Sequence, residues 1–277
     1  MKKGRIWNFN ILSVFVRCLF ALVFIAPFYV SFTYAVKTKQ EIAFSGLAFP
    51  TSIHFENFVR GIKMSNFFLA LKNSLITTIS GTLVLTVVCS MAAYIISREK
   101  NKIYHVAYLL FLLTVLIPFQ SMMFPLYLTF KEWSLVNTLI GFTLAKIGGQ
   151  VGFCILIMTG FMKTIPYEIE EAAYIDGAGR YGIFWKIVFP IMKPIVITSV
   201  VINSLSIWND FSVAMVLLQK KQVAIIPLMT YYFFGENVVE LNIAFAVFAL
   251  SMIPILLLYI VAQKYIISGI MVGAVKG

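Results

Sequence analysis

The stretch Glu170-Glu171-Ala172-Ala173-Tyr174-Ile175-Asp176-Gly177-Ala178-Gly179 is part of the longest polar interval between two strongly apolar parts of the chain. Pro166 shortly before it favours the start of a helix, because proline fits the first turn, where a missing N–H costs nothing. Glu168, Glu170 and Glu171 then lie near the positive end of the helix dipole. We expect Gly177 to end this helix.

A second short helix is predicted beyond Gly177. Ile183, Phe184, Ile187 and Val188 recur at helical spacing and form an apolar face, and Pro190 is expected to close the helix. Two short helices joined at a glycine could form a rigid projection that fits a cleft on another protein. They could equally form a loop that packs on its own chain, and the residue pattern leaves both interpretations open.

The same residues form a spaced pattern: Glu171-Ala172-Ala173, three residues, Gly177, nine residues, Ile187, one residue, and Phe189-Pro190. This pattern resembles the EAA loop of ABC-importer permeases, with Phe189 in place of the usual leucine. The fuller string, with Asp176, is most similar to the carbohydrate-importing, maltose-type subfamily. The resemblance covers nearly the whole chain, with further matches at Asn73-Ser74, Pro118, Pro125-Leu126-Tyr127, Asn137-Thr138, Trp208-Asn209-Asp210-Phe211 and Gly273 to Gly277.

Composition indicates an integral membrane protein. Of the 277 residues, 61% are hydrophobic and only 12% are charged, which exceeds what a soluble core of this size needs. The net charge of +11 is spread among loops, so no nucleic-acid partner is predicted. Cys18, Cys89 and Cys154 each lie in an apolar run without metal-ligand spacing, and we interpret them as packing residues with no metal site.

Six apolar runs of about 20 residues, the length that crosses a bilayer, predict an all-α protein with six transmembrane helices. We expect residues 1–277 to form a single permease domain with a polar loop at 163–193. Pro118 and Pro125 should kink the third span or end it early. Gly148 and Gly152 should allow close helix packing, an interpretation preferred over a gating hinge. The expected spans are 15–36, 73–97, 104–130, 138–162, 194–218 and 241–263.

An even number of spans puts both termini on one side of the membrane. The compact basic turn Arg98-Glu99-Lys100-Asn101-Lys102 favours the cytoplasm for this side, whereas the basic loop 37–72 is long enough to weaken its influence. We therefore expect a multi-pass protein of a bacterial cell membrane, with loop 163–193 in the cytoplasm. The first apolar run is expected to be a retained span, because Arg17 interrupts it and no clear cleavage site follows.

Catalytic motifs are missing from the sequence. It contains no Gly-Lys dipeptide, and therefore no phosphate-binding P-loop. It also contains no Gly-x-Ser-x-Gly or His-Glu-x-x-His pattern. We expect no enzymatic activity and no cofactor in this chain, so ATP hydrolysis would belong to a partner.

Ionisable residues inside apolar spans are functional clues, because one such group costs about 2.5–3.5 kcal/mol at mid-bilayer, and two of them stand out here. Lys146 and Asp210 fall at a similar depth, and we hypothesise that they face the translocation path and pair. The alternative is that Lys146 extends to the outer surface and Asp210 caps a local backbone kink. Lys146 departs from the family pattern, which is commonly uncharged there, and could reflect a substrate preference. Further path candidates are Gln150, Asn203, Ser206, Trp208 and Asn209.

The resemblance implies a permease subunit of a type I ABC importer that moves a sugar or oligosaccharide. Its implied partners are a homologous second permease in a heterodimer, two ABC ATPase subunits holding ATP-Mg, an extracytoplasmic sugar-binding protein and the lipid bilayer. The loop would dock on an ATPase, with Glu170 or Glu171 meeting a basic residue and Ile183, Phe184 and Ile187 giving apolar contact. The implied loop residues are Glu170, Glu171, Ala172, Ala173, Asp176, Gly177, Ile183, Phe184, Ile187 and Pro190.

Three alternatives remain. Within the same class, the solute could be a glycerol-phosphate compound. In other classes, the chain could be an ion-coupled secondary transporter that needs no ATPase, or a noncatalytic membrane scaffold. The EAA match and the lack of a visible inverted repeat argue against the last two.

Overall fold

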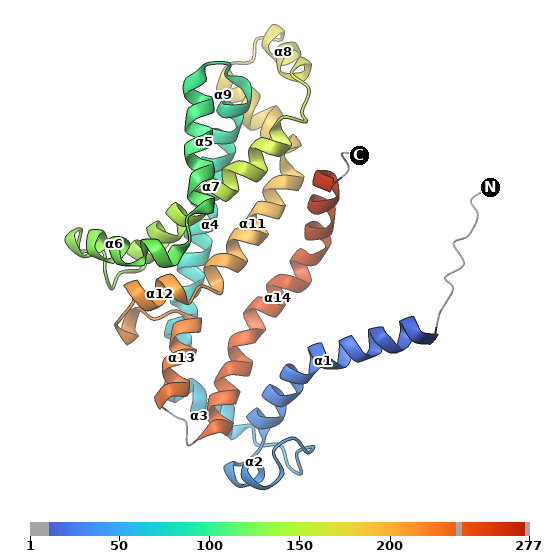
Figure 1. Cartoon of the computed structure of the whole chain (residues 1–277), viewed down its shortest axis with the longest axis vertical. Helices are drawn as coiled ribbons and strands as arrows, with labels where there is room; N and C mark the ends of the chain where they lie inside the picture. Colours follow the sequence, from blue (N-terminus) through green and yellow to red (C-terminus); the bar gives the residue numbers. More distant parts are fainter. Residues whose placement is uncertain (1–10, 237–239, 275–277) are drawn as a thin grey trace. The chain divides into compact units, whose positions relative to one another are not determined.

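The computed structural model describes residues 11–236 and 240–274, and all regular elements in these ranges are helices (Figure 1). This agrees with the all-α prediction. The described chain packs as two compact units. The first holds residues up to 67 together with 230–252, and the second holds residues 68–229 together with those from 253 onward.

The first unit contains α1 (Ile11–Val36), α2 (Lys39–Ser45), α3 (Glu56–Ser65) and the beginning of α14 (Leu241–Ala274). Ala35, Ala246 and Ala249 are buried together, with Phe58 and Phe245 packed against them. Such small residues let helices approach closely. Most of α1 exposes large apolar side chains, as expected of a helix that faces lipid.

A buried lysine organises the segment after α1. The Lys37 side chain is fully buried, and its Nζ donates to the carbonyl oxygens of Ser45, Gly46 and Ala48 at 2.8, 2.9 and 2.7 Å. These carbonyls lie at the end of α2, where a cation is favoured by the helix dipole. In α2, the pKa of the Glu41 carboxyl is lowered to about 2, mainly because its carboxylate accepts a hydrogen bond from the Thr51 hydroxyl.

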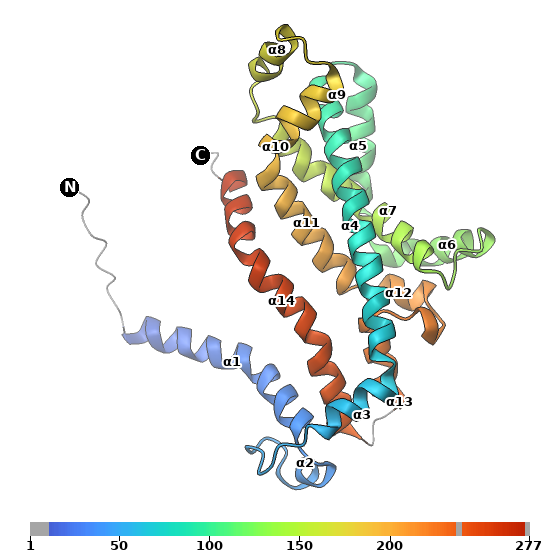
Figure 2. The same ribbon diagram turned by 180° about the vertical axis from the view of Figure 1, so that it is seen from behind.

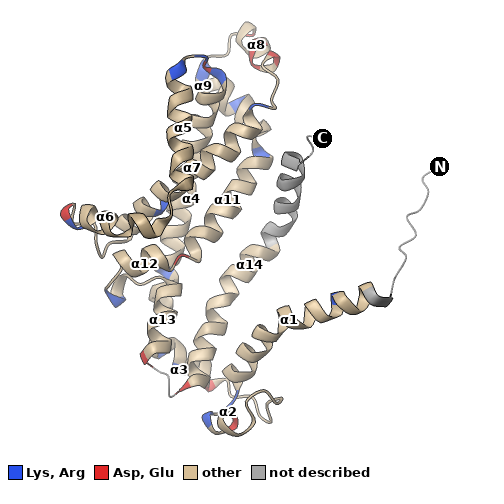
Figure 3. Ribbon diagram, in the orientation of Figure 1, with Lys and Arg blue, Asp and Glu red and all other residues tan. Residues whose placement is uncertain are grey.

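The second unit is built around α7, against which α5 and α11 both pack. Figures 1 and 2 show these helices side by side with α4, from opposite directions. Long stretches of α4, α5 and α11 carry few charges (Figure 3). Its longer helices are α4 (Phe67–Arg98), α5 (Lys102–Leu116), α6 (Phe119–Glu132), α7 (Leu139–Met162) and α11 (Lys193–Trp208). Its shorter helices include α12 (Ser212–Leu217), a 3₁₀ turn (Lys221–Val223) and the start of α13 (Ile226–Glu236).

Gly152 explains how closely α5 and α7 pack. A Cβ at Gly152 would collide with the Phe111 carbonyl and the Thr114 hydroxyl of α5, whereas a Cβ at Gly148 would meet nothing within 4 Å. The predicted packing role is therefore confirmed for Gly152. Gly148 is not part of that contact.

Two expected spans are not continuous helices. The third divides into α5 and α6, which meet at an angle of 104° at Ile117-Pro118, so the predicted break at Pro118 is confirmed. Pro125 instead lies inside α6. The fifth, expected at 194–218, ends its helix at Trp208, and α12 begins only at Ser212.

Among the described residues, four helices are long and apolar enough to cross a membrane, or six if each of two bent helix pairs counts as one span. The first bent pair is α5 with α6. The second joins the helical run Arg180–Ile191 to α11 at 75°. This bend lies at Met192, before the range 194–218 that was expected for the fifth span.

Several residues of the family pattern tie helix ends together. In α4, Asn73 Nδ2 donates to the carbonyl oxygens of Gln222 and Ala224 at 3.1 and 3.0 Å, and Ser74 Oγ accepts from the Ile226 N–H at 2.8 Å. At the start of α7, Thr138 caps the helix through the Gly141 N–H at 3.0 Å. These polar groups fix the loops at one end of the second unit.

Candidate functional site

The predicted two-helix loop is present as α8 (Glu168–Ile175) and α9 (Arg180–Ile183). Gly177 has φ +84°, the left-handed conformation that favours glycine. The Gly177 N–H donates to Tyr174 O and the Ala178 N–H to Ala173 O, each at 3.0 Å. This is the Schellman arrangement that ends a helix, so the predicted stop at Gly177 is confirmed.

The start of α8 differs slightly from the prediction. Pro166 precedes the helix instead of occupying its first turn, and Tyr167 is the N-cap residue. The first turn does carry Glu168, Glu170 and Glu171, which favours the helix electrostatically.

The second helix is longer than predicted, because Pro190 does not close it. A π turn (Phe184–Val188) follows α9, and α10 (Phe189–Ile191) continues through Pro190. A proline ring collides with the carbonyl four residues earlier in a regular α-helix. The wider π turn, in which the Phe189 N–H bonds to Phe184 O, displaces that carbonyl and lets the helix continue.

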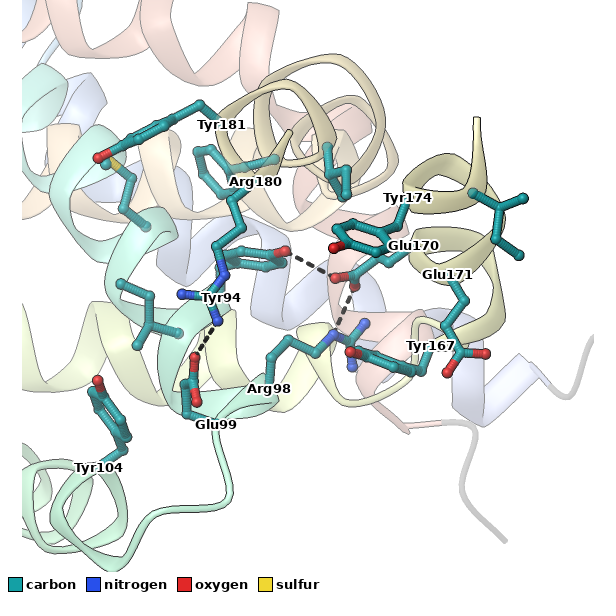
Figure 4. Close-up of a pocket in the computed structure, with 15 residues that line it drawn as sticks. Tyr94, Arg98, Glu99, Tyr104, Tyr167, Glu170, Glu171, Tyr174, Arg180 and Tyr181 are labelled. Atoms are coloured by element: carbon teal, nitrogen blue, oxygen red, sulfur yellow. Dashed lines mark hydrogen bonds and ion pairs between the residues drawn. The ribbon is translucent and has the colours of Figure 1, made fainter. Parts of the chain in front are cut away.

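Glu170 is bound within its own chain. Its side chain is 5% exposed, and its two oxygens accept from Arg98 Nε at 2.7 Å and from the Tyr94 hydroxyl at 2.9 Å. Arg98 Nη2 also donates to the Ile165 carbonyl at 2.9 Å. Figure 4 shows Tyr94 and Arg98 pointing toward Glu170, whereas the Glu171 carboxylate points away from them. Of the two residues predicted to meet an external basic residue, Glu170 is thus already paired within the chain, and the contact of Glu171 stays a prediction.

The apolar face of the loop also points inward. Ile183 and Phe184 are 4% and 3% exposed, and the Phe184 ring packs 5.3 Å from that of Tyr94. Ile187 is half-buried. The prediction that Ile183 and Phe184 offer apolar contact to a partner is therefore wrong, because they already cover the end of α4.

Other side chains form the exposed surface of the loop. Tyr174, Ile175 and Tyr181 are 71, 84 and 77% exposed. Glu171, Ala172 and Asp176 are also exposed, whereas Ala173 is buried. We call Glu171, Tyr174, Ile175, Asp176 and Tyr181 the exposed loop face.

A cavity of about 870 Å³ lies between this loop and the ends of α4 and α5. On its rim, Arg180 of α9 forms an ion pair with Glu99 at 2.6 Å (Figure 4). The cavity is lined mainly by aromatic and charged side chains, among them Tyr94, Arg98, Tyr104, Tyr167, Glu170, Tyr174 and Tyr181.

Sequence analysis missed the roles of Tyr94, Arg98 and Glu99. It used the charged turn after span two only to orient the chain. A signal was available, because predicted topology puts that turn and the Glu170 loop on the same side. Only the fold shows that the end of α4 and the loop with Glu170 are in contact.

Lys146 and Asp210 do pair, with Lys146 Nζ donating to Asp210 Oδ2 at 2.7 Å. Asp210 Oδ1 also accepts from the N–H groups of Val213 and Ala214 at 2.9 and 3.1 Å, so it caps α12 across the break in the fifth span. The proposed pairing and the alternative of a capping aspartate are both present. Lys146 is 9% exposed and bound, so it does not extend to a surface.

The other path candidates do not share one environment. Gln150 Nε2 donates to the Ser206 hydroxyl, and Ser206 and Asn209 are exposed. Asn203 and Trp208 are buried, at 2% and 5% exposure. Asn203 donates to the Ser199 hydroxyl at 3.0 Å and packs on Cys154. The structure therefore groups Gln150 with Ser206 and Lys146 with Asp210.

Apolar helices long enough to cross a bilayer, buried polar pairs between them and a protruding two-helix loop define a membrane transport subunit. The chain belongs to the family described as "Binding-protein-dependent transport system inner membrane component", whose model matches residues 87–272.

Relatives and solved structures agree with this assignment. The chain is 32% identical to the probable starch degradation products transport system permease protein AmyC of Thermoanaerobacterium thermosulfurigenes, over 100% of both chains. It is 33% identical to the melibiose/raffinose/stachyose import permease protein MelC of Bacillus subtilis, again over 100% of both. Its fold resembles a chain of a bacterial ABC transporter that imports alginate, with TM-score 0.80, 24% identity and coverage of 96% and 99%.

Proposed function

We propose that this chain is the transmembrane permease of an ATP-driven ABC importer that translocates a sugar or oligosaccharide. Two full-length relatives carry names that specify starch degradation products and melibiose, raffinose or stachyose. A binding protein would deliver the sugar, in keeping with the family description. The permease would pair with a homologous second permease.

The single observation that carries the coupling mechanism is the exposed loop face. Tyr174, Ile175 and Tyr181 are exposed, although the loop buries its other apolar side chains Ile183 and Phe184. Glu171 adds an exposed carboxylate to the same face. Exposed apolar groups of this kind mark a contact with another protein. We infer that this face docks on a separate ATPase, where Glu171 meets a basic residue.

Alternating access follows from that contact. ATP-Mg would bind and be hydrolysed on two partner ATPase subunits, whose closure moves both permeases from inward-facing to outward-facing. In this arrangement the loop and both termini face the cytoplasm, and the Lys146–Asp210 and Gln150–Ser206 pairs lie beside the path of the sugar.

The test is uptake by proteoliposomes that hold the whole complex, binding protein included. Labelled maltose, maltotriose, melibiose, raffinose, stachyose and glycerol 3-phosphate are compared with and without ATP. We expect ATP-dependent uptake of one sugar, and we expect Glu171→Lys and Gly177→Asp to abolish it while the permease remains in the membrane. Glu168→Lys on the same helix is the matched control and should retain uptake.

Two results would contradict the proposal. Uptake that persists without ATP and ignores both substitutions would indicate an ion-coupled transporter. ATP-dependent uptake of glycerol 3-phosphate alone would retain the coupling mechanism and reject the sugar.

A further inference from the structure

The last turn of α4 and Glu99, the residue directly after it, contact both helices of the loop. Tyr94 and Arg98 bind Glu170 of α8, and Glu99 binds Arg180 of α9.

The two attachments differ in strength. Arg98 and Glu170 are 14% and 5% exposed, and the second Glu170 oxygen is held by Tyr94. Separating them would leave an uncompensated charge in a buried site, which is strongly unfavourable. The Arg180 side chain is 82% exposed, so its pair with Glu99 is screened by solvent and contributes little.

The backbone before α8 is held in the same way. Arg98 also binds the Ile165 carbonyl, and its guanidinium carbon lies 5.7 Å from the ring centroid of Tyr167. One guanidinium therefore contacts both the segment before α8 and the first turn of α8. The start of α8 is thus fixed to α4 at both Ile165 and Glu170, and the Tyr94–Phe184 ring contact separately packs the π turn after α9 against α4.

We propose that the Arg98–Glu170 pair transmits movement of the docked loop into α4, and that Glu170 is a positioning residue and not a docking contact. Any displacement of α8 by a partner is carried to α4 through a buried ion pair, whereas the ion pair between Arg180 of α9 and Glu99 is exposed and carries little of it. This inference rests on the proposed function of the exposed loop face.

The test separates docking from transmission. The whole complex is reconstituted with wild type, Glu170→Gln, Arg98→Gln and the double variant, and three quantities are measured on each preparation. These are the amount of ATPase that co-purifies, the rate of ATP hydrolysis, and uptake of the sugar that gives the highest signal in the panel above. Glu168→Gln, an exposed carboxylate on the same helix, is the matched control.

We expect Glu170→Gln to retain the ATPase but to lower sugar uptake per ATP hydrolysed by about tenfold, a typical size for coupling between two sites. Arg98→Gln should give at least the same loss, since it also removes the bond to the Ile165 carbonyl, and the double variant should be no worse than Arg98→Gln, because both carry the loss of the same Arg98–Glu170 pair. A purely structural role would reduce the amount of assembled complex and leave the ratio of uptake to hydrolysis unchanged.

Three outcomes overturn the proposal: release of the ATPase by Glu170→Gln, an unchanged ratio, or additive losses in the double variant. Should the Glu170→Gln permease fail to fold in the membrane at all, Tyr94→Phe is used instead, because it removes one bond to Glu170 and keeps the ring packed on Phe184. It should lower the ratio in the same direction, and an unchanged ratio would again overturn the proposal. Failure of the proposed function is a separate result, in which Glu171→Lys leaves both ATPase binding and uptake intact.

Discussion

Asp210 uses its two carboxylate oxygens for different partners. One oxygen accepts from the Lys146 ammonium, and the other caps the first turn of α12. A charged pair inside an apolar span is tolerated because each charge neutralises the other and the remaining acceptor is hydrogen-bonded. This arrangement indicates that the pair holds the break after Trp208 in a fixed geometry.

A double-mutant cycle tests this interpretation. Asp210→Asn retains a capping oxygen but leaves the Lys146 charge buried and unpaired, so we expect the permease to lose about 3 kcal/mol of stability. Lys146→Met combined with Asp210→Asn removes both charges and should restore most of that loss. The measurement is thermal unfolding of the purified complex in detergent. A double variant whose loss equals the sum of the single losses would contradict the expected pairing.

From the sequence, Lys146 and Asp210 could either pair with each other or act separately, since a lysine and an aspartate at equal depth allow both. The sequence does not contain the distance between α7 and the fifth span. It also gave no reason to separate Gln150 and Ser206 from Asn203, whose amide is buried against Ser199.

Helix boundaries were predictable where backbone chemistry decides them. Gly177 ends α8 because the left-handed conformation favours glycine. Pro118 ends α5 because the residue before a proline disfavours the helical conformation, and Ile117 is extended. The π turn before Pro190 was not predictable. A proline in a helical pattern normally predicts a stop, and only the packed chain shows the wider turn that accommodates it.

The direction of an apolar face was also beyond the sequence. Ile183 and Phe184 have the spacing of an exposed docking face and of a buried one alike. The structure buries them against α4 and leaves Tyr174, Ile175 and Tyr181 outside. An amphipathic pattern indicates that a face is covered, without indicating which chain covers it.

The contact between α5 and α7 provides a matched pair of glycines. Gly152→Ala should cost about 1–3 kcal/mol, because the new methyl group overlaps the Phe111 carbonyl and Thr114 and forces the helices apart. Gly148→Ala meets open space and should be neutral or stabilise slightly, since alanine is the better helix former. Thermal unfolding midpoints of the two variants provide the measurement. Equal destabilisation by both would contradict the assigned contact.

At the scale of the whole molecule, the all-α membrane class was predicted correctly, but two of the six predicted spans are not continuous helices. Composition and apolar run length indicated a membrane protein, because they reflect the bilayer directly. The bends within the spans could not be predicted from the length of the apolar runs, because the residues on both sides of a bend are equally apolar. The helix break at 209–211 likewise lies inside the apolar run predicted as one span at 194–218. Asp210 caps α12 at this break through a local polar contact, which the apolar run does not reveal.

The basic turn at 98–102 predicts the orientation of the chain in the membrane, and cysteine labelling can test this prediction. The native Cys89 and Cys154 are fully buried, so replacing the exposed Cys18 by serine suffices to silence the background. Leu47→Cys, in the exposed segment after α2, should react with a membrane-impermeant maleimide in intact cells. Lys100→Cys, in the turn between α4 and α5, should react only after the membrane is permeabilised, because the positive-inside rule predicts a cytoplasmic location for this turn. Labelling of Lys100→Cys but not Leu47→Cys in intact cells would reverse the orientation and remove the exposed loop face from the reach of any cytoplasmic ATPase.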